Sequence, residues 1–184
     1  MKVLSILASP KKNGNTAALL NSFLKGAEDE GNVILDEIFL TSKNIHPCTA
    51  CDYCQKNDIG KCIIKDDMQE IYNQIKEADA IIFATPVYWW NMSSYLKIFI
   101  DRLYAVMTDE NNPPLKGKKA ALLMTYGGEL PNSGPEIVER SIRESSDYLG
   151  MNVQCVLGIC SSKPVSSNKE ALSKAYELGK QIRL

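Results

Sequence analysis

The 184-residue chain carries almost no net charge, because 21 lysines and arginines face 22 aspartates and glutamates, which gives −1 at pH 7. Nucleic acids and anionic membranes attract proteins through a field of one sign, so we expect neither as a partner. Apolar runs of the ~18–20 residues that cross a bilayer are also missing. The longest candidates, Asp79–Thr85 and Ala120–Met124, have the length of a strand. No membrane span is therefore expected.

The chain does not begin like an exported protein. In its first residues, MKVLSILASP, Ser5 interrupts the apolar stretch, and two lysines follow this stretch instead of preceding it. This pattern favours a first β-strand and a cytoplasmic protein whose thiols stay reduced.

Histidine is almost absent. The one histidine, His46, stands beside Pro47 in a predicted loop and is expected to be a surface residue instead of a ligand. One loop histidine offers no credible Ser-His-Asp triad, and no pair of carboxylates falls at the site predicted below. Hydrolytic chemistry is therefore disfavoured.

Apolar runs of strand length alternate with amphipathic helical stretches along the chain. The expected strands are Lys2–Ala8, Asn32–Leu40, Asp79–Thr85, Lys119–Tyr126 and Asn152–Cys160. The expected helices are Thr16–Glu30, Asp67–Ala78, Ser94–Met107, Pro135–Leu149 and Lys169–Arg183, with a loop over Asn111–Lys118. Asp67 and Glu70 have the spacing of a capping box. Strict βα alternation predicts an α/β fold, a doubly wound five-stranded parallel sheet with helices on both faces. We predict one domain over residues 1–184, with either the Rossmann or the flavodoxin-like strand order.

In both arrangements ligands bind beyond the carboxyl ends of the strands. The segment SPKKNGNT after the first strand is neither GxGxxG nor GxxxxGK[ST], which disfavours a dinucleotide pyrophosphate here and excludes a P-loop ATPase. It does offer hydroxyls from Ser9 and Thr16, an amide from Asn15, lysine charge and the free N–H groups of a helix start. These groups suit a phosphate monoester. The alternative is a plain polar loop in which Thr16 only caps the helix.

Three consecutive aromatic residues, Tyr88, Trp89 and Trp90, follow the third strand. A flat aromatic ligand would pack against such a wall, and Pro86 fixes the backbone so that the next amides can face the ligand's edge. The alternative is that Trp89 and Trp90 fill a core or a subunit interface, and we expect that one of them does.

Paired glycines, Gly127 and Gly128, follow the fourth strand and allow a ligand to approach the backbone closely. Taken alone they would indicate only a turn. Together the three loops offer a phosphate cradle, an aromatic wall and a glycine-rich approach. This combination describes a site for a phosphorylated planar ring, and FMN fits it best.

Four of the six cysteines lie within fifteen residues, at Cys48, Cys51, Cys54 and Cys62. In a reducing compartment this grouping suggests metal or redox chemistry instead of disulfides. Zinc sites prefer two separated pairs, whereas three cysteines at successive x2 spacings with a more distant fourth are typical of a [4Fe–4S] cluster. Four reduced thiols in an ordered loop, or a zinc ion, are the alternatives. The other two cysteines, on the last strand, are expected to be small core residues.

Three segments together resemble the NAD(P)H-dependent FMN reductase family. This family belongs to a flavodoxin-like superfamily that also includes quinone reductases, azo reductases and iron–sulfur flavoproteins. The segments are SPKKNGNT (Ser9–Thr16), PCTACDYC…C followed by IIKDDM (Ile63–Met68), and TPVYWWNMSSYLKIFIDR (Thr85–Arg102). They lie in the first hundred or so residues, and the last third of the chain matches by pattern only.

The resemblance implies the flavodoxin-like strand order and a particular cofactor site. It implies an FMN phosphate on Ser9, Lys11, Asn15 and Thr16, an isoalloxazine ring on Pro86, Val87, Tyr88 and Trp89, and the loop with Thr125, Gly127 and Gly128 on the other side of the ring. In the cysteine-rich loop, residues 46–63, it implies a [4Fe–4S] cluster on Cys48, Cys51, Cys54 and Cys62. Lys97 and the Asp101-Arg102 pair match a family signature that we interpret as structural, with these charges pairing near a subunit interface.

The leading prediction is an FMN-dependent oxidoreductase that passes electrons from NAD(P)H through FMN to a small acceptor such as a flavin or quinone. No residue has to act as an acid or base, although Tyr88 or Tyr126 can donate a hydrogen bond. One alternative is an iron–sulfur flavoprotein electron carrier with ferredoxin as a partner. Carriers of the flavodoxin type tend to be strongly acidic, so the small net charge favours the enzyme. Another alternative is a nucleotide- or metal-binding regulatory module.

We also expect a homodimer or homotetramer. A chain this short places its loops on one edge of the sheet and leaves a large apolar ring half exposed, so a neighbouring subunit would have to cover it. The aromatic loop and the helix Ser94–Met107 are the expected contact.

Overall fold

The computed structural model describes residues 1–57, 60–107 and 113–182. Its parallel strands lie in the order β2-β1-β3-β5-β6. Their bounds are β1 Lys2–Leu7, β2 Ile34–Phe39, β3 Ala80–Tyr88, β5 Lys119–Tyr126 and β6 Asn152–Cys160. A two-residue strand, β4 (Asn91–Met92), pairs antiparallel with the end of β3. With β4 set aside the order is 2-1-3-4-5, which confirms the flavodoxin-like arrangement and not the Rossmann one.

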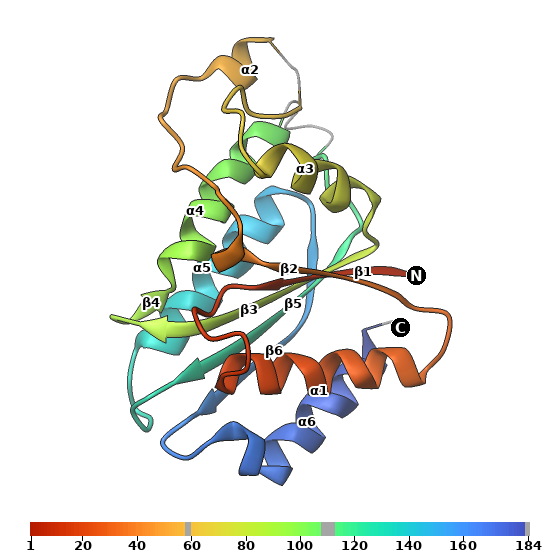
Figure 1. Ribbon diagram of the computed structural model, residues 1–184, viewed down its shortest axis with the longest axis vertical. Helices are drawn as coiled ribbons and strands as arrows, with labels where there is room; N and C mark the ends of the chain where they lie inside the picture. Colours follow the sequence, from red (N-terminus) through yellow and green to blue (C-terminus); the bar gives the residue numbers. More distant parts are fainter. Residues whose placement is uncertain (58–59, 108–112, 183–184) are drawn as a thin grey trace.

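Helices cover both faces of this sheet, as right-handed crossovers require. On one face lie α1 (Asn15–Asp29) and α6 (Lys169–Gln181), and on the other lie α3 (Met68–Glu77), α4 (Ser94–Arg102) and α5 (Gly134–Tyr148) (Figure 1). Helices α1 and α6 approach so closely that a Cβ on Gly26 or on Gly179 would collide with the backbone of the opposite helix. Glycine at these two positions therefore lets the two helices pack backbone to backbone.

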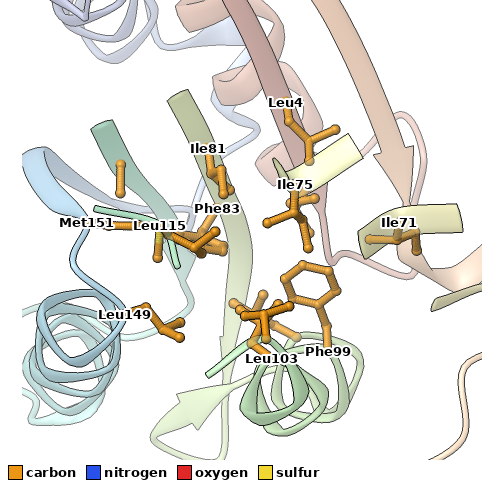
Figure 2. Close-up of a cluster of buried hydrophobic side chains, with 14 of the residues drawn as sticks. Leu4, Ile71, Ile75, Ile81, Phe83, Phe99, Leu103, Leu115, Leu149 and Met151 are labelled. Atoms are coloured by element: carbon orange, nitrogen blue, oxygen red, sulfur yellow. The ribbon is translucent and has the colours of Figure 1, made fainter. Parts of the chain in front are cut away.

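The core is split by the central strands. Strand β3 is buried from Ala80 to Pro86, which fits a strand covered on both faces. Figure 2 shows the larger of the two clusters, where Ile71 and Ile75 of α3 and Phe99 of α4 pack beneath the sheet. This packing fixes α3, which follows the cysteine loop in the chain, and α4, whose last residues lie beside that loop.

The expected elements are confirmed, with differences at their ends. The helix expected over Ser94–Met107 stops at Arg102 and continues as a 3₁₀ turn, Leu103–Val106. A short helix, α2 (Tyr53–Asn57), forms inside the cysteine-rich loop and was not expected. The expected loop Asn111–Lys118 and the end of the last helix at Arg183 fall partly outside the described residues.

The expected capping box at α3 is wrong. Asp67 makes no side-chain cap, because its carboxylate accepts the backbone N–H of Asn44 instead. The neighbouring Asp66 carboxylate accepts the N–H of Met68 at the start of the helix. The two aspartates thus anchor the beginning of the cysteine-rich loop to α3.

The sheet brings the ends of its central strands to one edge. In the register of the sheet Leu7 stands opposite Ala84, and Pro86 stands opposite Thr125. The loops that follow β1, β3 and β5 therefore begin side by side, as the sequence predicts. Within the described part of the chain, no helix is both long and apolar enough to cross a membrane.

Candidate functional site

A cavity of about 650 Å³ lies between the loop after β3 and the loop after β5. It is lined by Val87, Tyr88, Trp89, Trp90, Tyr126, Gly127, Gly128 and Asn132. The aromatic wall and the paired glycines thus face one space, as the sequence predicts. Cavities of this size and apolar character hold cofactor-sized ligands.

The aromatic wall is the tip of a hairpin. Tyr88 pairs with Asn91 across the β3–β4 ladder, so Trp89 and Trp90 are the two central residues of the turn. Both have positive φ values, 48° and 59°, which is the signature of a type I′ turn. Bulky residues rarely adopt this conformation, and each such residue costs of order 1–3 kcal/mol. The fold alone gives no reason for tryptophan here.

Neither tryptophan is in the core. Trp89 is 89% exposed and Trp90 is 54% exposed, so neither fills the core of this chain, and the expected place at a subunit interface stays a prediction. The remaining interpretations are a ligand contact or a subunit contact.

The glycine loop is held open by Asn132. Its amide nitrogen donates to the carbonyl of Gly128 at 3.0 Å, and its carbonyl oxygen accepts the N–H of Gly134 at 3.1 Å. A Cβ built on Gly127 meets nothing within 4 Å. The chain itself therefore leaves free space at Gly127, on the side of the sheet edge where the cavity lies.

The loop after β1 lies outside the lining of this cavity, and its side chains are partly engaged. Thr16 is buried, and its hydroxyl lies 2.7 Å from that of Thr125. The side-chain oxygen of Asn15 accepts the N–H of Val165, which leaves its amide N–H groups to donate elsewhere. The Ser9 hydroxyl faces back onto Lys11, from whose N–H it accepts a hydrogen bond. Gly14 is the N-cap residue of α1, so the start of this helix has no side-chain cap.

Of the residues predicted to hold a flavin, the structure brings Val87, Tyr88, Trp89, Gly127 and Gly128 together around the cavity. Pro86 and Thr125 lie just behind them, buried in paired strands. Trp90 belongs to the predicted aromatic wall but not to the flavin contacts that the family resemblance implies, and it also lines the cavity. Nothing in the sequence pattern points to Asn132.

A second pocket gathers the four clustered cysteines. Cys48, Cys51, Cys54 and Cys62 all line it, together with residues of the end of α4 and the turn that follows. Figure 1 shows α2 and this loop at the end of α4 away from the β3–β4 hairpin. At 1.5 Å per residue, the nine residues of α4 separate the two pockets by roughly 13 Å along its axis.

The loop around Cys51 has an unusual backbone. Its two neighbours, Ala50 and Asp52, both have φ of 53°, in the left-handed region. The pKa of the Cys51 thiol is lowered, first by the backbone N–H of Tyr53 and then by the hydroxyl of Thr49. Backbone and hydroxyl donors therefore favour a thiolate at this position.

The described part of the cysteine loop offers no site for a single metal ion. Across residues 1–57, 60–107 and 113–182, no three His, Cys, Asp or Glu side chains are placed to hold one metal ion. A [4Fe–4S] cube has four cysteine ligands, one for each iron, so its ligands surround a larger group than one ion. Four cysteine thiols are the type and number of donors that such a cube takes.

The remaining cysteines behave as expected in part. Cys155 packs against the second core cluster, and burial raises the pKa of its thiol to about 11. Both Cys155 and Cys160 are only partly buried.

The charged residues of the α4 signature form ion pairs, as expected, but Arg102 pairs outside the signature with Asp66, and a subunit interface near these charges stays a prediction. Lys97 pairs with Asp101 one turn on at 2.6 Å, on the exposed side of α4. Arg102 forms a fully buried pair with Asp66 at 2.6 Å and also donates to the carbonyl of His46 at 2.7 Å. The His46 side chain is exposed, as predicted. Asp66 was not singled out from the sequence.

A family model for NADPH-dependent FMN reductases matches residues 1–154. The chain belongs to this FMN reductase family. Two relatives, from Archaeoglobus fulgidus and Methanosarcina thermophila, are each named an iron-sulfur flavoprotein. The first is 38% identical over 70% of this chain and 56% of its own length. The second is 36% identical over 83% of this chain and 76% of its own length. This chain thus matches little more than half of the Archaeoglobus protein.

Solved structures agree on the fold of this FMN reductase family member. An NAD(P)H:quinone oxidoreductase from Methanothermobacter marburgensis superposes with a TM-score of 0.77 over 100% of this chain and 96% of its own, at 19% identity. At that identity the likeness shows the flavodoxin-like fold alone.

The exposed turn of this family member leads to a prediction. We expect Trp89→Gly to raise the melting temperature, because glycine adopts positive φ without the cost of about 1 kcal/mol or more that tryptophan bears. NAD(P)H oxidation by the flavin-loaded protein should slow, because the ring of Trp89 lines the cavity. Trp89→Ala is the matched control: it loses the same ring but keeps a Cβ at positive φ, so it should slow turnover without the gain in stability. A large loss of stability in both variants would show that Trp89 is a packing residue instead.

Proposed function

We propose that the chain is an FMN-dependent oxidoreductase that passes electrons from NAD(P)H to a small acceptor, a flavin or a quinone. The observation that carries this proposal is the cavity of about 650 Å³ between the aromatic hairpin and the glycine loop. One wall of this cavity is apolar, and on the other side the backbone of the glycine loop is accessible. The cavity lies at the carboxyl edge of a flavodoxin-like sheet. Membership in the FMN reductase family supports the same cofactor.

The residues around the cavity fit an isoalloxazine ring. Val87, Tyr88 and Trp89 offer an apolar and aromatic surface on one side. On the other side, Gly127 and Gly128 leave the backbone accessible, and the free space beside Gly127 is room that a Cβ would otherwise take. Pro86 and Thr125 support these two walls from paired strands.

The loop after β1 fits the phosphate of FMN. The uncapped start of α1 presents backbone N–H groups, which attract an anion at a helix N-terminus. Ser9, the amide of Asn15 and the charge of Lys11 add donors. Thr16 contributes differently from the sequence expectation, because its hydroxyl is held by Thr125. We propose that this buried hydrogen bond ties the phosphate loop to the glycine loop.

FMN, when bound, accepts a hydride from NAD(P)H and passes electrons to the acceptor. The chain's own residues would place it: backbone groups of the two loops would bind the ring, and the aromatic hairpin would exclude water from one side. The cavity is open, which leaves access for a second planar molecule. No side chain is required to move a proton in this scheme.

Anaerobic titration tests this function. The purified protein should bind FMN with quenching of flavin fluorescence, and NADH or NADPH should bleach the bound flavin directly, with reoxidation by added quinone or free flavin. Absence of FMN binding would contradict the site. FMN binding without reduction by either nicotinamide would favour a carrier over an enzyme.

A second candidate function adds a [4Fe–4S] cluster that exchanges electrons with the flavin. It is supported by the four cysteines that line one pocket and by the names of the two relatives. In that case a redox protein such as ferredoxin is the proposed partner. The cysteine pocket and the flavin cavity are separate, so either group can be held without the other.

Replacement of one cysteine separates the two cofactors. We expect Cys51→Ala to lose all cluster iron and to retain FMN, because different loops hold the two groups. Wild-type protein purified without oxygen should contain about four irons and four sulfides per chain. Cys155→Ala is the matched control, since it removes a cysteine from β6 and should leave the iron content unchanged. Iron-free wild-type protein with full NAD(P)H-dependent activity would show that the cysteine loop is structural.

We further propose that a second copy of this chain covers the exposed hairpin in a homodimer or homotetramer. The exposed rings of Trp89 and Trp90 beside the cavity support this arrangement. Sedimentation of the FMN-loaded protein tests it, because a fully active monomer would contradict it.

A further inference from the structure

Arg102 is fully buried, and one of its donors has no partner in the described structure. Its Nη1 donates to Asp66 at 2.6 Å and to the carbonyl of His46 at 2.7 Å, and its Nη2 donates to Asp66 at 3.1 Å. Its Nε is the buried side-chain nitrogen that has no hydrogen-bond partner. A buried donor left unsatisfied destabilises the folded state, and more so when it belongs to a charged group.

The place of Arg102 suggests what satisfies that donor. The residue lines the same pocket as Cys48, Cys51, Cys54 and Cys62. The other side of its guanidinium is closed by Asp66 and the carbonyl of His46. Buried polar groups in native proteins normally have partners, and a group with sulfur acceptors held in this pocket would supply one for the Nε of Arg102.

We propose that the Nε–H of Arg102 donates a hydrogen bond to a sulfur of the iron–sulfur group on the four cysteines, and that this contact sets the reduction potential of that group. The inference rests on the proposed cluster and goes beyond it, since it assigns a tuning role to a residue that is not a ligand. Hydrogen bonds to sulfur, net charge and solvent exposure are the factors through which proteins control cluster potentials. Arg102 would supply a hydrogen bond to sulfur and a positive charge, both from a buried position.

The charges around Arg102 agree with this role. Burial lowers the pKa of its guanidinium, but Asp66, Tyr72 and Cys62 outweigh burial and raise it, so the side chain stays a cation. Asp66 is the facing anion, and the Tyr72 hydroxyl donates to the backbone carbonyl of Arg102. Reduction adds one negative charge to a cluster, so a nearby cation and a hydrogen bond should make reduction easier.

The test is an anaerobic redox titration of the reconstituted protein with dithionite, with iron content and melting temperature measured beside it. Arg102→Lys keeps the charge and loses the Nε donor. We expect it to retain iron and to shift the equilibrium at least tenfold toward the oxidised cluster, about 59 mV lower for a one-electron couple. The matched control is Arg140→Lys, the same change in an exposed ion pair on α5. It should leave the potential unchanged.

A second pair of variants separates tuning from loosening of the loop. Asp66→Asn removes the facing anion and should raise the potential. Asp66→Asn combined with Arg102→Gln avoids an unpaired buried charge. Its reduction potential should lie below that of Asp66→Asn alone by at least a tenfold shift of the redox equilibrium, about 59 mV. If Arg102 only supports the loop, both sets of variants should lower the iron content or the melting temperature, and the reduction potential of the iron that remains should equal that of the wild type. That result would show that the proposal is wrong. Wild-type protein that binds no iron overturns the cluster and this role together, whereas an unmoved potential in iron-loaded Arg102→Lys overturns this role alone.

Discussion

Asp66→Ala should lower the free energy of unfolding by about 3–5 kcal/mol, because it leaves the buried guanidinium of Arg102 without its partner. Both side chains of this pair have 0% exposure, and Asp66 also accepts the N–H groups of His46 and Met68. One carboxylate thus joins α4, the start of α3 and the beginning of the cysteine loop. Urea unfolding of the cofactor-free protein measures the effect.

The exposed pair on the same helix is the matched control. Asp101 pairs with Lys97 at 2.6 Å, but both side chains are about half exposed. Asp101→Ala should cost only about 0.3–0.5 kcal/mol, since exposed i,i+4 pairs contribute little. Equal losses in the two variants would show that the buried pair adds no more than a surface contact.

The Asp66 carboxylate should also make the stability of the protein fall at low pH. Burial raises the pKa of Asp66, but hydrogen bonds from Arg102 and from the N–H groups of His46 and Met68 outweigh burial and lower it below the ordinary 3.8. A carboxyl group whose pKa is lower in the folded state than in the unfolded state stabilises the folded protein at any pH above the unfolded-state pKa. That stabilisation is lost as the pH falls through the folded-state pKa. Wild-type protein should therefore lose more stability than Asp66→Asn when the pH drops below about 4.

The sheet order and most elements could be predicted, because a strand that is buried on both faces appears in the sequence as a continuous apolar run. The run from Ala80 to Thr85 is nearly all apolar, and strict alternation with helices implies parallel strands. The hairpin after β3 could not be predicted. Two-residue type I′ turns are normally signalled by Asn-Gly or similar pairs, and two tryptophans give the opposite signal.

The site could be predicted only where its residues follow strands. Tyr88, Trp89, Gly127 and Gly128 were found because carboxyl ends of parallel strands meet at one edge. The partnership of Asp66 and Arg102 could not be found, since the two residues are 36 positions apart and no periodicity links them. Local spacing does not reveal which charges a tertiary fold buries together.

Gly127→Val should weaken FMN binding at least a hundredfold, about 2.8 kcal/mol, while the cofactor-free protein keeps its stability within about 0.5 kcal/mol. Without a ligand, a Cβ at this position meets nothing within 4 Å, and Gly127 does not need the left-handed conformation. A valine side chain would instead occupy the space in which we place the flavin ring. Fluorescence titration with FMN and thermal unfolding without it measure the two quantities separately.

Gly117 lies at the opposite end of the same strand and provides the control. Its φ is +79°, and a Cβ there also meets nothing within 4 Å, so Gly117→Val is strained by its backbone alone. It should lower the melting temperature and leave FMN affinity unchanged, the reverse of the result at Gly127. If Gly127→Val binds FMN as tightly as wild type, the ring does not lie against the loop after β5. The apolar cavity beside Trp89 would then have to hold a different ligand.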